Sequence, residues 1–207
     1  MKEGMNDIAI IILAAGSSSR MGQSKQLLLV DGEPLLLKTV RTALEVKTAS
    51  VIVVLGAHDQ EHATVTQNHA VNLVFNERWQ RGMGSSLKVG LQFLEDNTPA
   101  AESVIILVCD QPALTTEHLL NLIQTYKKSG KSIIASYYSN APGVPALFDK
   151  THFNELLHLD DLQGAKKIIQ QNMAVTELIH FPEGTIDLDT PGDYQQYINS
   201  LKIEKPS

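Results

Sequence analysis

The sequence predicts an α/β protein in which helices cover both faces of a mostly parallel sheet. Apolar runs alternate along the chain with amphipathic stretches, the pattern of strands that are joined by helices. The runs VIVVLG and VIILVC lack polar alternation, which is typical of central strands buried on both faces. The chain has 207 residues, of which 43% are hydrophobic, so it can bury a sizeable core. We therefore expect residues 1–207 to form a single domain.

The individual elements follow from these runs and from local start signals. The expected strands are Ile8–Leu13, Val51–Leu55, Val71–Phe75, Val104–Val108 and Ile133–Ser136. The expected helices are Pro34–Val46, Asp59–Thr66, Ser85–Leu94, Thr115–Lys128, Gln163–Gln170 and Pro191–Leu201. Pro34 and Pro191 suit a first helical turn, and Thr115 can cap a helix whose first turn includes Glu117.

Charge and cysteine content narrow the function classes. The net charge of −6 argues against general nucleic-acid binding, although one polyanion can still bind in a locally basic pocket. Cys109 is the single cysteine, so no internal disulfide is possible and a reducing cytoplasm fits. No apolar run reaches membrane-spanning length, and the first residues lack the apolar core of a signal peptide. We therefore expect a cytoplasmic protein without membrane contacts.

The segment LAAGSSSRMGQSKQLL, residues 13–28, is the strongest functional signal. Its small residues let backbone N–H groups approach a ligand closely, while Arg20 and Lys25 add positive charge. A strand that runs into such a loop predicts a cradle for phosphate groups. The spacing is neither that of a Walker A loop nor that of the dinucleotide pattern G-x-G-x-x-G.

Asp110 follows an expected central strand in the string VCDQP. A carboxylate at a strand end beside a nucleotide can hold Mg²⁺, and Pro112 stiffens the turn behind it. The alternative is a turn in which Asp110 caps the helix that begins near Thr115. Cys109 is interpreted as a small buried residue and not as a nucleophile.

Two later segments carry further candidates. Ser85 and Ser86 stand where a helix begins, so their hydroxyls can meet a base edge or phosphate, or simply cap that helix. Asp187 and Asp189 alternate along an expected short strand and so share one face, with Asp189 the better candidate for a second metal ligand. Thr190 is an expected cap of the last helix.

These motifs resemble those of the MobA-like nucleotidyltransferase family. The family signature is LAAG or LAGG, then S-x-R-M-G, then a lysine before paired leucines, and residues 13–28 match it. C-D-x-P, N-x-x-W-x-x-G-M-x-S-S-L and D-I-D-T-P are similar to segments at residues 109–112, 76–87 and 187–191. LAAG and CDQP look like the molybdenum cofactor cytidylyltransferases. The resemblance implies a three-layer Rossmann-like fold of the nucleotide-diphospho-sugar-transferase type.

The resemblance also implies a reaction and its residues. Such enzymes transfer CMP from CTP to the phosphate of molybdenum-molybdopterin and release pyrophosphate. Carried over by motif, Arg20, Lys25 and Asp110 are the catalytic residues, and Mg²⁺ lies on Asp110 and Asp189. The implied nucleotide-binding residues are Leu13, Ala14, Ala15, Gly16, Ser17, Arg20, Lys25, Gly82, Ser85, Ser86 and Asp110. Related cytidylyltransferases read the base with a serine positioned like Ser86, and a molybdenum hydroxylase is the implied transient partner.

The acceptor region departs from the family pattern. Gly143 and Pro145 match a G-x-P segment near the acceptor, but Val144 stands where histidine is common. Relatives often carry G-D-x-G-A-R, whereas this chain has DDLQGAK at residues 160–166. Lysine at the last position removes the bidentate fork of arginine. Two alternatives therefore stay open: a GTP-using molybdopterin guanylyltransferase, and a non-catalytic accessory protein that delivers molybdenum cofactor to a hydroxylase.

Overall fold

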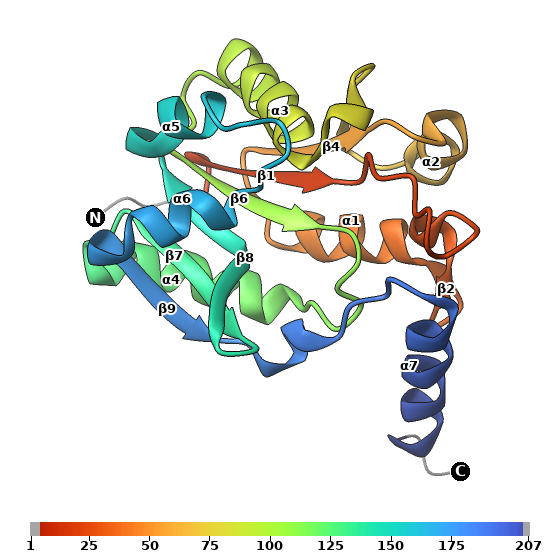
Figure 1. The fold of residues 1–207 in the computed structure, drawn as a ribbon. Helices are drawn as coiled ribbons and strands as arrows, with labels where there is room; N and C mark the ends of the chain where they lie inside the picture. Colours follow the sequence, from red (N-terminus) through yellow and green to blue (C-terminus); the bar gives the residue numbers. More distant parts are fainter. Residues whose placement is uncertain (1–4, 205–207) are drawn as a thin grey trace.

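The computed structural model describes residues 5–204, and it has the three layers that the sequence predicts (Figure 1). A seven-stranded sheet has the order β5-β4-β1-β6-β8-β7-β9, and β2 and β3 form a separate two-stranded sheet. The strands are β1 Ile8–Leu13, β2 Leu29–Val30, β3 Glu33–Pro34, β4 Ser50–Leu55, β5 Asn72–Phe75, β6 Ser103–Val108, β7 Ile133–Tyr138, β8 Ala141–Asp149 and β9 Thr176–His180. The helices are α1 Leu35–Glu45, α2 Asp59–Thr66, α3 Met83–Asn97, α4 Thr116–Ser129, α5 Phe153–Leu157, α6 Lys166–Gln171 and α7 Pro191–Glu204.

Side chains of β1 show why helices are needed on both faces. Ile8, Ile10 and Ile12 join one buried cluster, whereas Ala9, Ile11 and Leu13 join the other, because successive residues of a strand point to opposite faces. Side chains of α1 and α4 contribute to the first cluster, and side chains of α3, α5 and α6 contribute to the second. All of β1 is buried, so the apolar run without alternation is explained.

Most strand pairs are parallel, as expected. β1 pairs in parallel with β4 and β6, β4 pairs with β5, and β7 pairs with β9. Within the large sheet β8 is the exception, because it runs antiparallel to both β6 and β7, and the small sheet of β2 and β3 is antiparallel as well. The chain leaves β1 toward β4 on one side and returns to β6 on the other, so a crevice opens between the loops that follow β1 and β6.

Two strands of the large sheet escape prediction from the sequence. β8 carries Pro142, Gly143 and Pro145, which predict a loop, but its pairing with β6 begins only at Ala146. The prolines therefore lie where the strand has β7 as its one neighbour, and a missing N–H costs little there. β9 is an edge strand with mostly exposed side chains, so it has no apolar run to detect.

Local boundaries differ modestly from expectation. Thr115 caps α4 by accepting a hydrogen bond from the backbone of His118, as predicted. α6 begins at Lys166, three residues after the expected Gln163. The expected short strand around Asp187 and Asp189 is wrong, because residues 186–189 have no regular secondary structure. No helix among the described residues is long and apolar enough to cross a membrane.

Candidate active site

A cavity of about 320 Å³ opens in this crevice, at the carboxyl ends of β1 and β6. Its walls come from the loop after β1, from the approach to α3 and from the end of β6. The lining residues are Leu13, Ala15, Gly16, Ser17, Lys25, Gln26, Trp79, Gln80, Gly82, Met83, Ser86, Val108, Cys109 and Asp110. Of the residues implied to bind nucleotide, Ala14, Arg20 and Ser85 lie outside this lining.

Gln26 holds the loop after β1 in shape, a role that was not predicted from the sequence. Its side chain is 2% exposed, and its Nε2 donates to the carbonyl oxygens of Ala14 and Gly16 at 3.3 and 2.9 Å. Its Oε1 accepts from the hydroxyls of Ser18 and Ser24. A polar residue directly before the apolar pair Leu27-Leu28 is the signal that could have revealed it.

These contacts leave the N–H groups of the loop available to a ligand. The carbonyl of Ala15 accepts from the backbone of Ala57, and those of Ala14 and Gly16 accept from Gln26. Among the residues that the structure describes, no hydrogen bond uses the N–H of Ala15, Gly16 or Ser17. Successive N–H groups in a tight loop form a concave site for an anion. The loop can therefore cradle phosphate oxygens.

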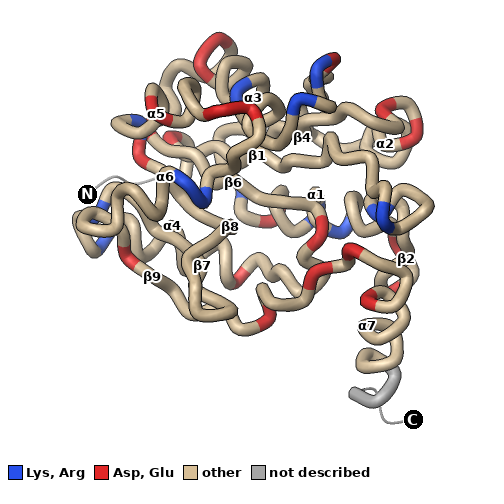
Figure 2. The backbone as a smooth tube through the Cα atoms, viewed as in Figure 1, with Lys and Arg blue, Asp and Glu red and all other residues tan. Residues whose placement is uncertain are grey.

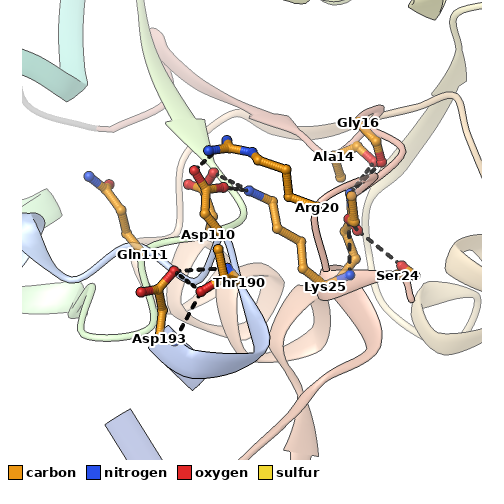
Figure 3. Close-up of polar contacts among 12 residues, drawn as sticks. Ala14, Gly16, Arg20, Ser24, Lys25, Asp110, Gln111, Thr190 and Asp193 are labelled. Atoms are coloured by element: carbon orange, nitrogen blue, oxygen red, sulfur yellow. Dashed lines mark hydrogen bonds and ion pairs between the residues drawn. The ribbon is translucent and has the colours of Figure 1, made fainter. Parts of the chain in front are cut away.

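Lys25 reaches across the crevice to the carboxylates (Figure 3). Its Nζ lies 2.7 Å from Oδ2 of Asp110 and 3.0 Å from Oδ1 of Asp189. Arg20 approaches Asp189 from the more exposed side, with Nη2 2.5 Å from Oδ2. Figure 2 shows the same arrangement on the backbone, with basic positions after β1 opposite acidic positions before α7. The alternative in which Asp110 caps α4 is not what the structure shows, because Thr115 caps that helix.

The charges of this cluster shift one another's pKa values. Burial by itself lowers the pKa of Lys25, but the attraction of Asp110 and Asp189 outweighs burial and raises it to about 12. Burial raises the pKa of Asp189, but Lys25 and Arg20 outweigh that effect and lower it. Burial raises the pKa of Cys109 to about 12, so its sulfur is a thiol at neutral pH, as expected for a small buried residue.

Asp187 completes a group of three carboxylates. One oxygen from each of Asp110, Asp187 and Asp189 lies within 4.8 Å of the others, so the group could hold a divalent cation. Partial desolvation and the neighbouring Asp110 raise the pKa of Asp187 to about 6, although it is the exposed member of the three. Leu188, which lies between the two aspartates in the sequence, is fully buried.

The two serines at the start of α3 differ in their placement. Ser85 donates to the carbonyl of Gly82 at 2.8 Å and lies outside the cavity lining, and it does not cap α3, because Gly82 is at the cap position and no side chain caps this helix. Ser86 lines the cavity and accepts from Nδ2 of Asn76 at 2.9 Å. No described residue accepts the hydroxyl hydrogen of Ser86. Ser86 can therefore donate to a ligand.

Gly82 and Gly84 lie directly against the loop of residues 160–163, where a side chain would not fit. A Cβ on Gly82 would lie 2.4 Å from the carbonyl oxygen of Asp161, and one on Gly84 would lie 2.3 Å from that of Asp160. The N–H of Gly84 donates to the carbonyl of Asp161, whose side chain pairs with Arg81 and Lys88. Residues 160–163 are thereby fixed against the start of α3, and Gly82 still lines the cavity.

The implied acceptor residues lie on β8, outside the cavity lining. The peptide bond between Val144 and Pro145 is cis. A Cβ on Gly143 would lie 2.6 Å from the hydroxyl oxygen of Tyr138, so the glycine is needed for this packing. The carbonyl of Pro145 accepts from the hydroxyl of Ser136 at 2.6 Å.

His118 supports this strand and predicts a pH dependence of stability. Its Nε2 lies 2.8 Å from the hydroxyl oxygen of Ser136, whose hydrogen is already donated to Pro145, so Nε2 must be the donor in this contact. Burial lowers the pKa of His118 to about 4. Because the unfolded chain takes up this proton near pH 6.5 and the native ring does not, the free energy of unfolding falls as the pH drops from 6.5 to 4, by up to about 3 kcal/mol from this group.

Urea unfolding at pH 7 and pH 5 tests this role of His118. Between these two pH values, the free energy of unfolding should fall less for His118→Gln than for the unchanged protein. The exposed His158→Gln serves as the control, and equal losses in both variants would contradict the assignment.

Comparisons with known proteins find relatives that cover most of the chain. Residues 10–176 match the model of the MobA-like NTP transferase domain. The chain is 30% identical to purine catabolism protein PucB of Bacillus subtilis, over 89% of this chain and 92% of the relative. It is 25% identical to the molybdenum cofactor cytidylyltransferase of Escherichia coli, over 92% and 95%.

Solved structures share the fold. Rv0371c of Mycobacterium tuberculosis is 26% identical with a TM-score of 0.81, covering 94% of this chain and 98% of that one. A manganese complex of Rv0371c gives 24% identity and a TM-score of 0.78, covering 94% and 100%.

Proposed function

The chain belongs to the family of MobA-like NTP transferase domains, and on that premise we propose that it transfers CMP from CTP to the phosphate of molybdenum-molybdopterin. The observation that carries this proposal is the convergence of Lys25, Asp110 and Asp189 beside a cavity whose loop presents unused N–H groups. The similarity to a molybdenum cofactor cytidylyltransferase supports the choice of substrates. Pyrophosphate is the second product.

Asp110, Asp187 and Asp189 would hold the metal, for which Mg²⁺ is our assignment. Three hard oxygen donors within 4.8 Å of one another suit Mg²⁺ or Mn²⁺, which prefer carboxylates together with phosphate oxygens. When bound, the ion supplies positive charge that offsets the charge of the reacting phosphates. The manganese complex of Rv0371c agrees with a divalent ion in this fold.

The residues of the chain itself act mainly by positioning. A phosphate oxygen of the acceptor attacks the α-phosphorus of CTP in line, and pyrophosphate leaves, so little proton transfer is required. The N–H groups of residues 15–17 orient the triphosphate, and Ser86 donates to the base. Lys25 and Arg20 leave the carboxylates and compensate charge on the phosphates. β8, the strand that carries Gly143 and Pro145, faces the acceptor, molybdenum-molybdopterin.

A thermal-shift comparison tests the preference for cytosine. Ala15 is buried, lines the cavity and stands where the LAGG form of the family signature has glycine. At a nucleotide concentration of about 100 times Kd, binding stabilises the native state by about 2.7 kcal/mol. For a chain of this length, that raises Tm by roughly 5–10 °C. CTP should produce this shift at concentrations where GTP, ATP and UTP produce much less, and equal shifts with CTP and GTP would contradict the preference.

The competing candidate is a non-catalytic accessory protein that delivers molybdenum cofactor to a hydroxylase. The identity to PucB, whose name refers to purine catabolism and not to a transferase, favours it. Incubation with CTP, Mg²⁺ and molybdopterin separates the two. Stoichiometric pyrophosphate release supports the enzyme, whereas tight cofactor binding without pyrophosphate supports the accessory protein.

A further inference from the structure

Gln111 is a buried amide that joins three segments of the chain, directly after Asp110. Its side chain is 5% exposed. Its Nε2 lies 3.2 Å from the hydroxyl oxygen of Tyr138 on β7 and 3.2 Å from the carbonyl oxygen of Val144 on β8. It also lies 3.4 Å from the carbonyl oxygen of Gly184, in the 3-10 helix Pro182–Thr185. That helix leads directly into the segment with Asp187 and Asp189.

The other end of the amide is not satisfied. Oε1 of Gln111 is buried and has no hydrogen-bond partner among the described residues. A buried acceptor without a partner costs free energy, which an apolar side chain of the same length would avoid. Stability alone therefore does not explain a glutamine at this position. What the amide contributes is the set of contacts made by Nε2.

Gln111 is one of several links between the end of β6 and the segment that carries the other two carboxylates. A backbone bond from the N–H of Leu188 to the carbonyl of Asp110, at 3.2 Å, is another, and Lys25 contacts the side chains of both Asp110 and Asp189. The bonds at Gly184 and Leu188 hold the backbone of the segment at two points, whereas Lys25 contacts only the side chain of Asp189. In Figure 3 the side chain of Gln111 points away from Lys25 and Arg20, so it does not face the reacting groups.

We propose that Gln111 is a positioning residue for the divalent cation. It holds Asp187 and Asp189 at the correct distance from Asp110, and through Val144 it couples this site to the strand that faces the acceptor. This inference rests on the proposed function, because it requires the three carboxylates to bind a metal. Residues that orient metal ligands typically change metal affinity by roughly 10–100-fold when they are replaced.

The test is a titration of the full chain with Mn²⁺ in the absence of nucleotide, with free Mn²⁺ measured by electron paramagnetic resonance. Gln111→Met keeps the length of the side chain but cannot donate to Gly184 or Val144. We expect it to bind Mn²⁺ about tenfold more weakly while its urea midpoint stays unchanged. Gln111→Asn keeps the amide but is one methylene shorter, so it should weaken binding in the same direction even if Gln111→Met does not fold. Gln92→Met makes the same exchange on the exposed side of α3 and should bind like the unchanged protein.

The outcomes separate this inference from the proposed function. If the unchanged protein binds Mn²⁺ and Asp110→Asn does not, the metal site stands. Unaltered Mn²⁺ affinity in both Gln111 variants would then overturn the positioning role alone. A loss of affinity that only accompanies a lower urea midpoint would also overturn it, because that result describes a structural residue. If the unchanged protein binds no Mn²⁺ at this cluster, the metal assignment in the proposed function fails, and the inference fails with it.

Discussion

Asp110→Asn is expected to abolish most pyrophosphate release while the protein stays folded. Asparagine keeps the shape of the side chain, but it removes the charge that Asp110 supplies to the metal group and to Lys25. Loss of about 3 kcal/mol of charge stabilisation in the transition state slows turnover by roughly two orders of magnitude. The effect on stability should be small, because Lys25 keeps its contact with Asp189 and the backbone carbonyl of residue 110 still accepts from Leu188.

The measurement is the turnover rate at saturating CTP over a series of Mg²⁺ concentrations. Asp189→Asn should be the milder change, because an amide oxygen can still coordinate a cation. Asp96→Asn, on the exposed side of α3, controls for loss of a carboxylate elsewhere. An Asp110→Asn variant with an unchanged rate and an unchanged Mg²⁺ requirement would refute the metal assignment.

Lys25→Met is expected to have two opposite effects: turnover is lost, and affinity for free metal increases. The ammonium group contacts two of the carboxylates that we propose as metal ligands, at 2.7 Å from Asp110 and 3.0 Å from Asp189. Methionine has a similar length and no charge, so it removes this competitor. It also removes the positive charge that the triphosphate requires, so the turnover rate should fall by roughly two orders of magnitude or more.

The stability of Lys25→Met provides the second readout. The raised pKa of Lys25, about 12, means that its ion pairs stabilise the protein at neutral pH and are lost only as the pH rises through that value. Without the lysine, three carboxylates repel one another, and unfolding should become easier by about 1–3 kcal/mol. Added Mn²⁺ should raise Tm more in Lys25→Met than in the unchanged protein. Weaker Mn²⁺ binding by the variant would show that Lys25 supports the metal and does not compete with it.

The sequence predicted those parts of the fold that depend on continuous apolar runs. β1, β4, β5, β6 and β7 were found because each is a run of apolar residues between polar segments. β8 was missed because two prolines and a glycine predict a loop, and only the pairing with β7 shows why they are tolerated. β9 was missed because it is an edge strand with mostly exposed side chains, so its sequence contains no apolar run that would reveal it.

The candidate site was predictable to the level of segments but not of contacts. The carboxyl ends of parallel strands meet at one edge of a sheet, so the loop after β1 and Asp110 had to lie close together. Three features depend on side-chain conformation and on the packing of distant loops: the ion pair between Lys25 and Asp110, the internal contacts of Gln26, and the fit of residues 160–163 against Gly84. Local patterns carry no information about any of them.

The ammonium group of Lys25 acts as a counter-ion that is covalently part of the chain. We therefore expect the stability of the folded protein not to depend on a bound metal ion. A zinc finger unfolds when a chelator removes its cation, because folding and metal binding are one process. Here the chain carries a positive charge of its own beside the carboxylates, the ammonium group of Lys25 at 2.7 Å from Asp110. Chelation should therefore leave an intact resting form that can be reloaded without refolding. Such a protein is suited to surroundings in which free divalent ions rise and fall.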